Sequence, residues 1–242
     1  GGTTVTATHT GAVAGTTLTF NATVPAAVND VNGVDVIANS LSLLNGATLQ
    51  DAAGNNATLV NVLTNLSNDN VDTTAPTVST IAGSGSATIH NTGDNIDVTV
   101  TFSEAVTLSN ATDAQIQLNI EGTTVNATHF GSASGTSLTF RAAVTAGLND
   151  ADGVDVIANS LSLLNAATLQ DGAGNDTTLT HAIQNLANDT VDTTAPTVTT
   201  IAGSGSATVH TAGDNIDVTL TFSEAVTLSN ATDAQIQLNI GG

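Results

Sequence analysis

The sequence predicts an all-β protein assembled from repeated antiparallel β-sandwiches. Three observations support this fold class: a repeat of 120 residues without gaps, short segments in which apolar and polar residues alternate, and clusters of Gly, Asn and Asp between those segments. Residues 121–240 are about three quarters identical to residues 1–120, and Gly241–Gly242 match the start of the first copy. Such near-identical copies are typical of arrays that gain length by adding units, whereas an enzyme rarely needs them.

The boundaries between repeats are expected at Val71–Val78, a segment that recurs as Val191–Val198. Each copy contains a proline, Pro76 or Pro196, which lacks an N–H for a β-ladder and biases the preceding residue toward extended backbone, as at the entrance of a strand. Dividing the chain at these segments gives residues 1–72 as the C-terminal part of one repeat, 73–192 as a complete repeat, and 193–242 as the N-terminal part of the next. Each outer part carries only some of the strands of a sandwich. If ordered, we expect each to be completed by continuing chain or by a neighbouring molecule.

Alternation of apolar and polar residues locates strands in the complete repeat. Ile96–Ser103, Ile116–Ile120 and Leu138–Val144 have the period of two that is typical of half-buried strands. A short helical turn is expected around Ala158–Leu164. Turn-forming clusters separate the strands at residues 93–95, 131–135, 152–153 and 172–175. About seven short strands per repeat with short connections predict an Ig-like sandwich of the Greek-key type.

The composition excludes several functions. The chain has 21 Asp and Glu residues against a single Lys or Arg residue, Arg141, and a formal net charge of -20. Nucleic acids and anionic membranes bind proteins through basic side chains, so neither is an expected partner. There is no Cys for disulfide or thiol chemistry, and no apolar run approaches the ~18–20 residues of a membrane-spanning helix. The excess of negative charge instead calls for screening or bound cations.

Three motifs together resemble a known family. VDTTAPTV at residues 71–78, GDNIDVTVTFSEAV at residues 93–106 and LQDAAGN at residues 49–55 look like motifs of the bacterial Ig-like tandem repeats of giant secreted adhesins and surface filament proteins. The resemblance extends over the whole chain. It implies an extracellular, cell-surface stalk with Ca²⁺ at the junctions between repeats.

One set of acidic residues is expected to converge where the linker enters the complete repeat. The first strand of the sandwich starts at this pole and the second returns to it, so Glu104 should lie near Asp72 of the linker. Asp113 and the loop that carries Asp171 and Asn175 should reach the same pole. Ca²⁺ prefers six to eight oxygen ligands in irregular geometry, so these carboxylate and amide oxygens are a candidate calcium site.

A second acidic set is expected at the opposite pole. It consists of Asp150, Asp152 and Asp155, close to Asp192 of the exit linker and Glu224 of the following repeat. The alternative at both poles is an acidic surface that is simply hydrated, since Asp152-Gly153 is also an ordinary hairpin turn.

The resulting expectation is a non-enzymatic stalk or filament body rigidified by Ca²⁺. Its partners would be neighbouring repeats of the same chain or identical chains joined end to end. No nucleophile elbow or metal-ligand spacing of histidines is present. Two alternatives remain open: a filament subunit that polymerises by strand complementation, and a module that binds glycans or ice through Thr-rich strand faces such as Thr4–Thr8.

Overall fold

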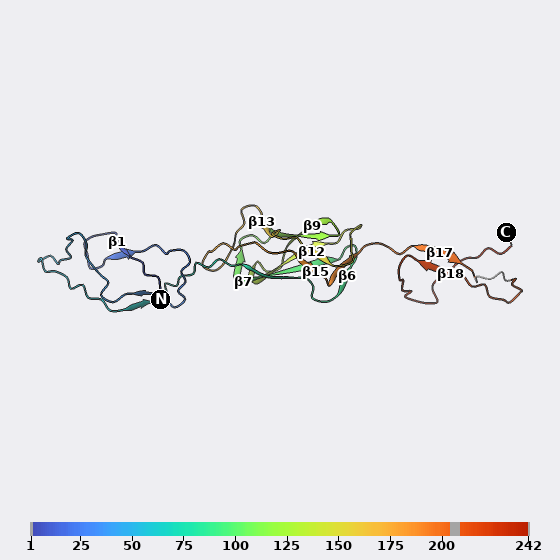
Figure 1. Ribbon diagram of the computed structural model, residues 1–242, viewed down its shortest axis with the longest axis horizontal. Helices are drawn as coiled ribbons and strands as arrows, with labels where there is room; N and C mark the ends of the chain where they lie inside the picture. Colours follow the sequence, from blue (N-terminus) through green and yellow to red (C-terminus); the bar gives the residue numbers. More distant parts are fainter. Residues whose placement is uncertain (1, 204–208, 242) are drawn as a thin grey trace.

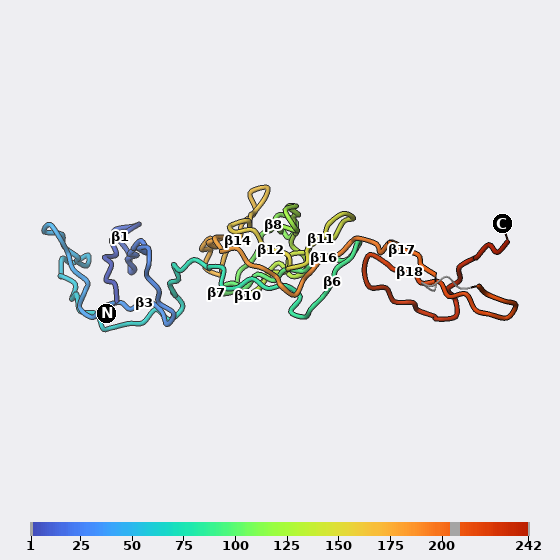
Figure 2. The backbone as a smooth tube through the Cα atoms, turned by 45° about the vertical axis from the view of Figure 1, so that its right-hand side comes forward, coloured from blue at the N-terminus to red at the C-terminus, as the bar shows by residue number. Residues whose placement is uncertain are grey.

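The computed structural model describes residues 2–203 and 209–241, and this part of the chain is all-β. It is extended along one axis (Figure 1). We refer to residues 2–72 as the N-terminal segment, residues 73–192 as the central segment, and residues 193–203 with 209–241 as the C-terminal segment. The central segment lies between the other two in both backbone views (Figures 1 and 2). Among the described residues, no helix has the length and apolar character needed to cross a membrane.

The strands are numbered along the chain. The N-terminal segment contains β1 (Thr8–Thr10), β2 (Thr19–Asn21), β3 (Val34–Val36) and β4 (Thr64–Leu66). The central segment contains β5 (Val78–Ala82), β6 (Thr88–His90), β7 (Asn95–Leu108), β8 (Ala114–Ile120), β9 (Thr123–Phe130), β10 (Ser134–Ala143), β11 (Asn149–Asp150), β12 (Val154–Val156), β13 (Ser162–Leu163), β14 (Leu169–Gln170), β15 (Gln184–Leu186) and β16 (Asp189–Asp192). The C-terminal segment contains β17 (Val198–Ala202) and β18 (Thr219–Phe222).

Two sheets form the central segment. The larger has nine strands in the order β14-β7-β10-β9-β8-β12-β15, with β5 also paired to β7 and β13 to β8. All of its pairings are antiparallel. The smaller has the order β11-β16-β6, in which β16 runs parallel to β6. The chain leaves the central segment through β16.

The hydrophobic core follows from the alternation of residues along these strands. On β7, Ile96, Val98 and Val100 are buried, while the residues between them are partly exposed. The same pattern holds on β8 and on β10, where Phe140 is the largest fully buried side chain. Every buried hydrophobic residue of the described chain lies between Ile96 and Val191.

The three strands expected from alternation are confirmed, and β7 extends further than predicted, to Leu108. The helical turn expected at Ala158–Leu164 is wrong. Asn159 and Asn165 have positive φ angles, which interrupt a helix, and Ser162–Leu163 pairs with β8 instead. The number of strands was also underestimated, because pieces of two or three residues are too short to show a period.

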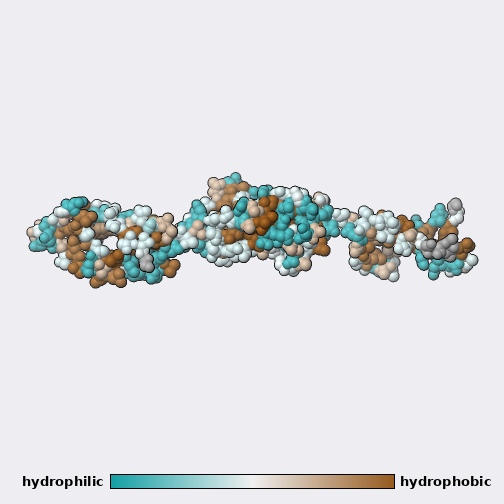
Figure 3. Space-filling model, viewed as in Figure 1, coloured by the Kyte–Doolittle hydropathy of each residue, from teal (hydrophilic) through white to brown (hydrophobic). Residues whose placement is uncertain are grey.

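The outer segments retain part of this architecture. The β1–β2 pair sets His9 opposite Phe20, in the register that sets His129 opposite Phe140 in the central segment. The β3–β4 and β17–β18 pairs likewise repeat the registers of β12–β15 and β5–β7. Many apolar side chains of these segments remain at the surface (brown in Figure 3).

The Thr-rich face expected at Thr4–Thr8 is not formed, because only Thr8 belongs to a strand. Its counterpart in the central segment, Thr124–Thr128, lies within β9 and pairs with β8. Within residues 2–72, no strand pairs with Thr4–Thr8 at the register of β8 and β9.

Candidate metal centre

Three of the predicted carboxylates meet where the linker enters the central segment. Asp72, Glu104 and Asp171 each place one carboxylate oxygen within 4.8 Å of the other two. They come from three separate parts of the chain: the linker, strand β7, and the turn that follows β14. The trio therefore connects the linker to an early strand and to a late turn of the central segment.

Hydrogen bonds hold two members of the trio, Asp171 and Asp72, in place. The Oδ1 atom of Asp171 accepts the backbone N–H groups of Ala173 and Asn175, at 2.8 and 2.9 Å. Its Oδ2 accepts the side-chain amide of Asn175 at 2.8 Å, and the same amide donates to the backbone carbonyl of Asp72 at 3.1 Å. Asn175, predicted as a ligand, thus ties the Asp171 turn to the linker. Asp72 itself accepts the backbone N–H of Thr74.

The three charges affect one another. Burial and the negative charges of Asp72 and Asp171 raise the pKa of Glu104 above its ordinary value. Burial also acts to raise the pKa of Asp171, but the hydrogen bonds from Asn175, Ala173 and Gly174 outweigh it and lower that pKa. The charge of Glu104 is therefore disfavoured when no cation is bound.

The donor set fits a hard divalent cation. Calcium–oxygen distances are about 2.3–2.6 Å, so three oxygens within 4.8 Å of one another can share one Ca²⁺ ion. All three ligands are carboxylates, whereas zinc sites in proteins are usually built with His or Cys. Asp72, Glu104 and Asp171 would hold the ion, with water supplying the remaining ligands.

A second trio lies elsewhere in the central segment and includes a residue that was not predicted. Glu121, Asp150 and Asp152 also bring carboxylate oxygens within 4.8 Å. Asp150 is buried, accepts the backbone N–H groups of Glu121 and Gly153, and has a pKa raised by burial and by the neighbouring Asp152. Glu121 could have been noticed because it replaces Gly1 of the first copy.

The other predicted ligands are not members of either trio among the described residues. Asp113 is buried and accepts the side-chain amides of Asn110 and Asn165, and Asp155 accepts that of Asn185. The backbone of Asp192 pairs with Asn149, next to Asp150. Glu224 lies in the C-terminal segment, where its Oε1 atom is buried without a hydrogen-bond partner.

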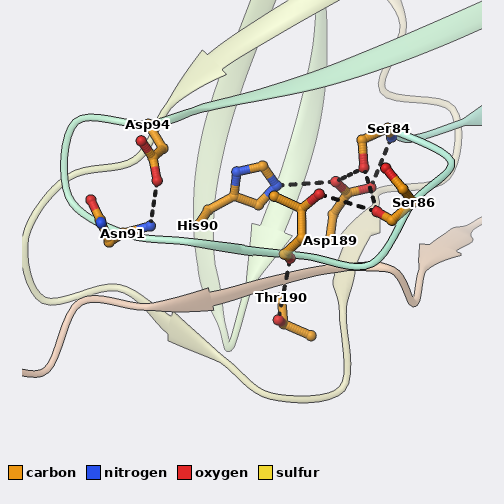
Figure 4. Close-up of polar contacts among 8 residues, drawn as sticks. Ser84, Ser86, His90, Asn91, Asp94, Asp189 and Thr190 are labelled. Carbon is orange, nitrogen blue, oxygen red and sulfur yellow. Dashed lines mark hydrogen bonds and ion pairs between the residues drawn. The ribbon is translucent and has the colours of Figure 1, made fainter. Parts of the chain in front are cut away.

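Sequence reasoning missed a buried polar cluster on the smaller sheet (Figure 4). The Asp189 Oδ1 atom is 3.0 Å from His90 Nε2 and accepts the Ser84 hydroxyl at 2.6 Å, and both the His and the Asp are buried. In a catalytic triad the histidine would lie between the serine and the aspartate. Here the aspartate lies between them, so the cluster ties β6 to β16 and does not activate a nucleophile.

Asp189 lies 105 positions after Ser84 and 99 positions after His90, and no local motif links it to them. In comparisons with known proteins, no family model, no curated protein and no solved structure matches this chain.

Proposed function

We propose that this chain is a non-enzymatic stalk of tandem Ig-like β-sandwiches, extracellular, in which Ca²⁺ at the Asp72 junction fixes the direction of the linker. The observation that carries the proposal is the meeting of Asp72, Glu104 and Asp171 from linker, strand and loop. The near-identical copies and the extended arrangement of the three segments also support a spacer (Figure 1).

Calcium would act on the linker through charge. Without a cation, three carboxylates repel one another at the point where the chain enters the central segment, which favours linker directions that separate them. A bound divalent ion reverses the sign of that interaction and holds Asp72 against Glu104 and Asp171. The spacer then has a preferred direction at its junction.

The acidic surface and the small number of protein ligands suit an extracellular site. Extracellular calcium modules bind with dissociation constants of about 0.1–1 mM, which three carboxylates and several waters can provide. The proposed location outside the cell also agrees with the resemblance to secreted adhesin repeats.

The first test is thermal unfolding of the 242-residue chain in Ca²⁺ and in a chelator. Ca²⁺ at 100 times its dissociation constant would stabilise the native state by about 2.7 kcal/mol. The variant Glu104→Gln should unfold at a higher temperature than the wild type in chelator, because it removes repulsion, and should gain much less from Ca²⁺. The control Asp217→Asn, which alters an exposed carboxylate of the C-terminal segment, should keep the full effect. Identical wild-type curves with and without Ca²⁺ would refute the calcium site.

The second test measures the linker itself. The chain has no Cys, so Thr58→Cys and Thr124→Cys introduce unique positions for spin labels on the N-terminal and central segments. The distribution of distances between the labels should narrow when Ca²⁺ is added, and Glu104→Gln should abolish the narrowing. A distribution that Ca²⁺ leaves unchanged would show that the ion, even if bound, does not stiffen the junction.

A further inference from the structure

Side chains that form the core of the central segment are exposed at the same repeat positions in the outer segments. Phe140 is 0% exposed, while Phe20, its counterpart in the N-terminal segment, is 43% exposed. Ile116 is 0% exposed, while Ile236 in the C-terminal segment is 49% exposed. Other exposed apolar residues at core positions of the C-terminal segment are Ile216, Val226, Leu228, Leu238 and Ile240.

The pairings that the outer segments lack have one property in common. In the central segment, six strand pairs join residues 73–120 to residues 121–192: β7–β10, β8–β9, β8–β12, β8–β13, β7–β14 and β6–β16. None of these six has a counterpart within the described residues of the outer segments. The pairings inside each half do have counterparts, in the same registers. Each outer segment is thus arranged like one half of the central segment without the other half.

Residues equivalent to those that make these six pairings in the central segment are present at the other end of the same chain. Residues 193–240 differ from residues 73–120 at five positions: Ser79/Thr199, Ile89/Val209, Asn91/Thr211, Thr92/Ala212 and Val100/Leu220. Every core position of β7 and β8 keeps an aliphatic or aromatic side chain of similar volume. The two outer segments lie at opposite ends of the molecule, with the central segment between them (Figure 2).

We propose that residues 193–241 of one molecule bind residues 2–72 of a second copy, in the register that joins the two halves of the central segment. Phe20 would then lie opposite Val218, as Phe140 lies opposite Val98, and Val36 opposite Leu238, as Val156 lies opposite Leu118. Strand addition of this kind supplies both main-chain hydrogen bonds and side-chain burial. The Asp72 calcium site proposed above is not part of this interface.

The proposed register brings both favourable and repulsive polar pairs together at this interface. The counterparts of His90 and Asp189 are His210 and Asp69, which the proposed register brings together from two molecules. Glu224, whose Oε1 atom has no hydrogen-bond partner, would face the turn of Asp51. That turn already has the geometry of the Asp171 turn, since Asp51 accepts the backbone N–H and the side-chain amide of Asn55. One contact is lost, because Asn21 replaces Arg141 opposite the counterpart of Asp97.

The association would be head-to-tail. The two binding surfaces differ, so a joined pair of molecules keeps one free surface of each kind, and the assembly grows as an open chain of molecules. Both surfaces are acidic, so raising the salt concentration should strengthen the association by screening.

Disulfide cross-linking tests the register directly. Thr99 and Thr139 are partners on β7 and β10, and their counterparts are Thr219 and Thr19. Directly opposed residues of antiparallel strands have Cα atoms about 4.5–5.5 Å apart, within the range of a disulfide. We expect a mixture of full-length Thr19→Cys and Thr219→Cys chains to form a cross-linked heterodimer under mild oxidation. The mismatched pair Thr19→Cys and Thr227→Cys, shifted by eight residues along the strand, should cross-link at least tenfold less.

Solution mass supplies the second readout. Sedimentation of the wild-type chain should show a mass that rises with concentration. Ile236→Asp should shift this dependence at least tenfold toward higher concentration, whereas the control Thr227→Asp, whose counterpart Thr107 is exposed in the central segment, should not. Amide exchange of the central segment serves to check that both variants retain its fold. A wild-type chain that stays monomeric at all concentrations, or cross-linking that is equal for matched and mismatched pairs, would overturn the proposal.

Discussion

Strand β7 and its counterpart at residues 215–228 differ at one position, Val100/Leu220, yet they have different structures. The central copy is a strand of 14 residues, Asn95–Leu108, whereas the outer copy forms only Thr219–Phe222. In the central segment β7 has three neighbours, β5, β10 and β14, and in the outer copy only the counterpart of β5 remains. Strand formation here depends on cross-strand partners more than on local propensity.

Burial differs in the same way. Val106 is 1% exposed and Val226 is 47% exposed, although both belong to the motif TFSEAV. Complete burial of an aliphatic side chain contributes roughly 1.5–3 kcal/mol relative to an exposed one. The outer copies lack this contribution at many positions. Matched substitutions in the central and outer copies should therefore have unequal effects on the free energy of unfolding.

The largest expected difference is between the two copies of the core phenylalanine. Phe140→Ala should lower the free energy of unfolding of the central segment by about 3–5 kcal/mol, because it leaves a large cavity among fully buried neighbours. Phe20→Ala, in the N-terminal segment, should change the free energy of unfolding of the central segment by less than about 0.5 kcal/mol. Guanidinium unfolding followed by circular dichroism and amide exchange measures both. Equal effects would mean that the two segments unfold as one cooperative unit.

The buried polar cluster gives the next largest effect. His90→Ala removes a partner of the buried Asp189 carboxylate and should cost about 1–3 kcal/mol. The matched change His210→Ala should cost within about 0.5 kcal/mol in a dilute monomer, because the counterpart of Asp189 lies at the far end of the chain. The same unfolding experiment at micromolar concentration compares them. A large cost for His210→Ala in a demonstrated monomer would show that the C-terminal segment has a tertiary structure of its own.

Arg141, the single basic residue, offers a smaller test. Its guanidinium makes two 2.6 Å hydrogen bonds to Asp97 and lies 3.6 Å from the centre of the Phe130 ring. Since both charged side chains are about one third exposed, Arg141→Asn should cost only about 1 kcal/mol. The reverse change in the first copy, Asn21→Arg, should be neutral in the monomer because Asp217 is distant. A cost above about 3 kcal/mol for Arg141→Asn would indicate that the pair acts as a buried one.

The smallest expected effect is the pH dependence of the free energy of unfolding, on which Glu104 and Asp97 act in opposite directions. The pKa of Glu104 is raised, so the native state takes up this proton before the unfolded chain does, and stability without Ca²⁺ should rise as pH falls toward 4.5. The pKa of Asp97 is lowered by Arg141, so its contribution is present above pH 3.8 and is lost as pH falls below that value. Unfolding measured in chelator over this range should show a shallow maximum, and Glu104→Gln should reduce the rise, to which the raised pKa of Asp150 also contributes. A steady decline of wild-type stability from neutral pH would contradict the raised pKa.

The sequence was sufficient to predict the strands with strict alternation and the approach of Glu104 to Asp72. Both follow from a period of two and from the return of a strand to the pole where the chain enters. It was insufficient for the cluster of His90 and Asp189, because contacts between residues 99 positions apart have no periodic signal. Asp113 was predicted at the same pole as Glu104, and in the structure its carboxylate accepts the side-chain amides of Asn110 and Asn165. The loops that share a pole could be predicted from the order of the strands, whereas the pairing of particular buried side chains required the fold.

The parallel pairing of β6 with β16 has a consequence for a chain under tension. Tension along the axis of Figure 1 would draw the exit linker, and with it the C-terminal end of β16, away from the entering linker that leads through β5 to β6. In a parallel pair, strands displaced in this way slide along one another, so their ladder bonds are loaded together. An antiparallel hairpin pulled from its open end would instead lose its bonds one at a time. The hydrogen bond from the Thr178 N–H to the Pro76 carbonyl and the parallel bridge between Thr77 and Thr178 extend this shear-loaded arrangement to the entering linker. The central segment should therefore resist extension more strongly than its thermodynamic stability alone would indicate, since forced unfolding follows the unfolding rate.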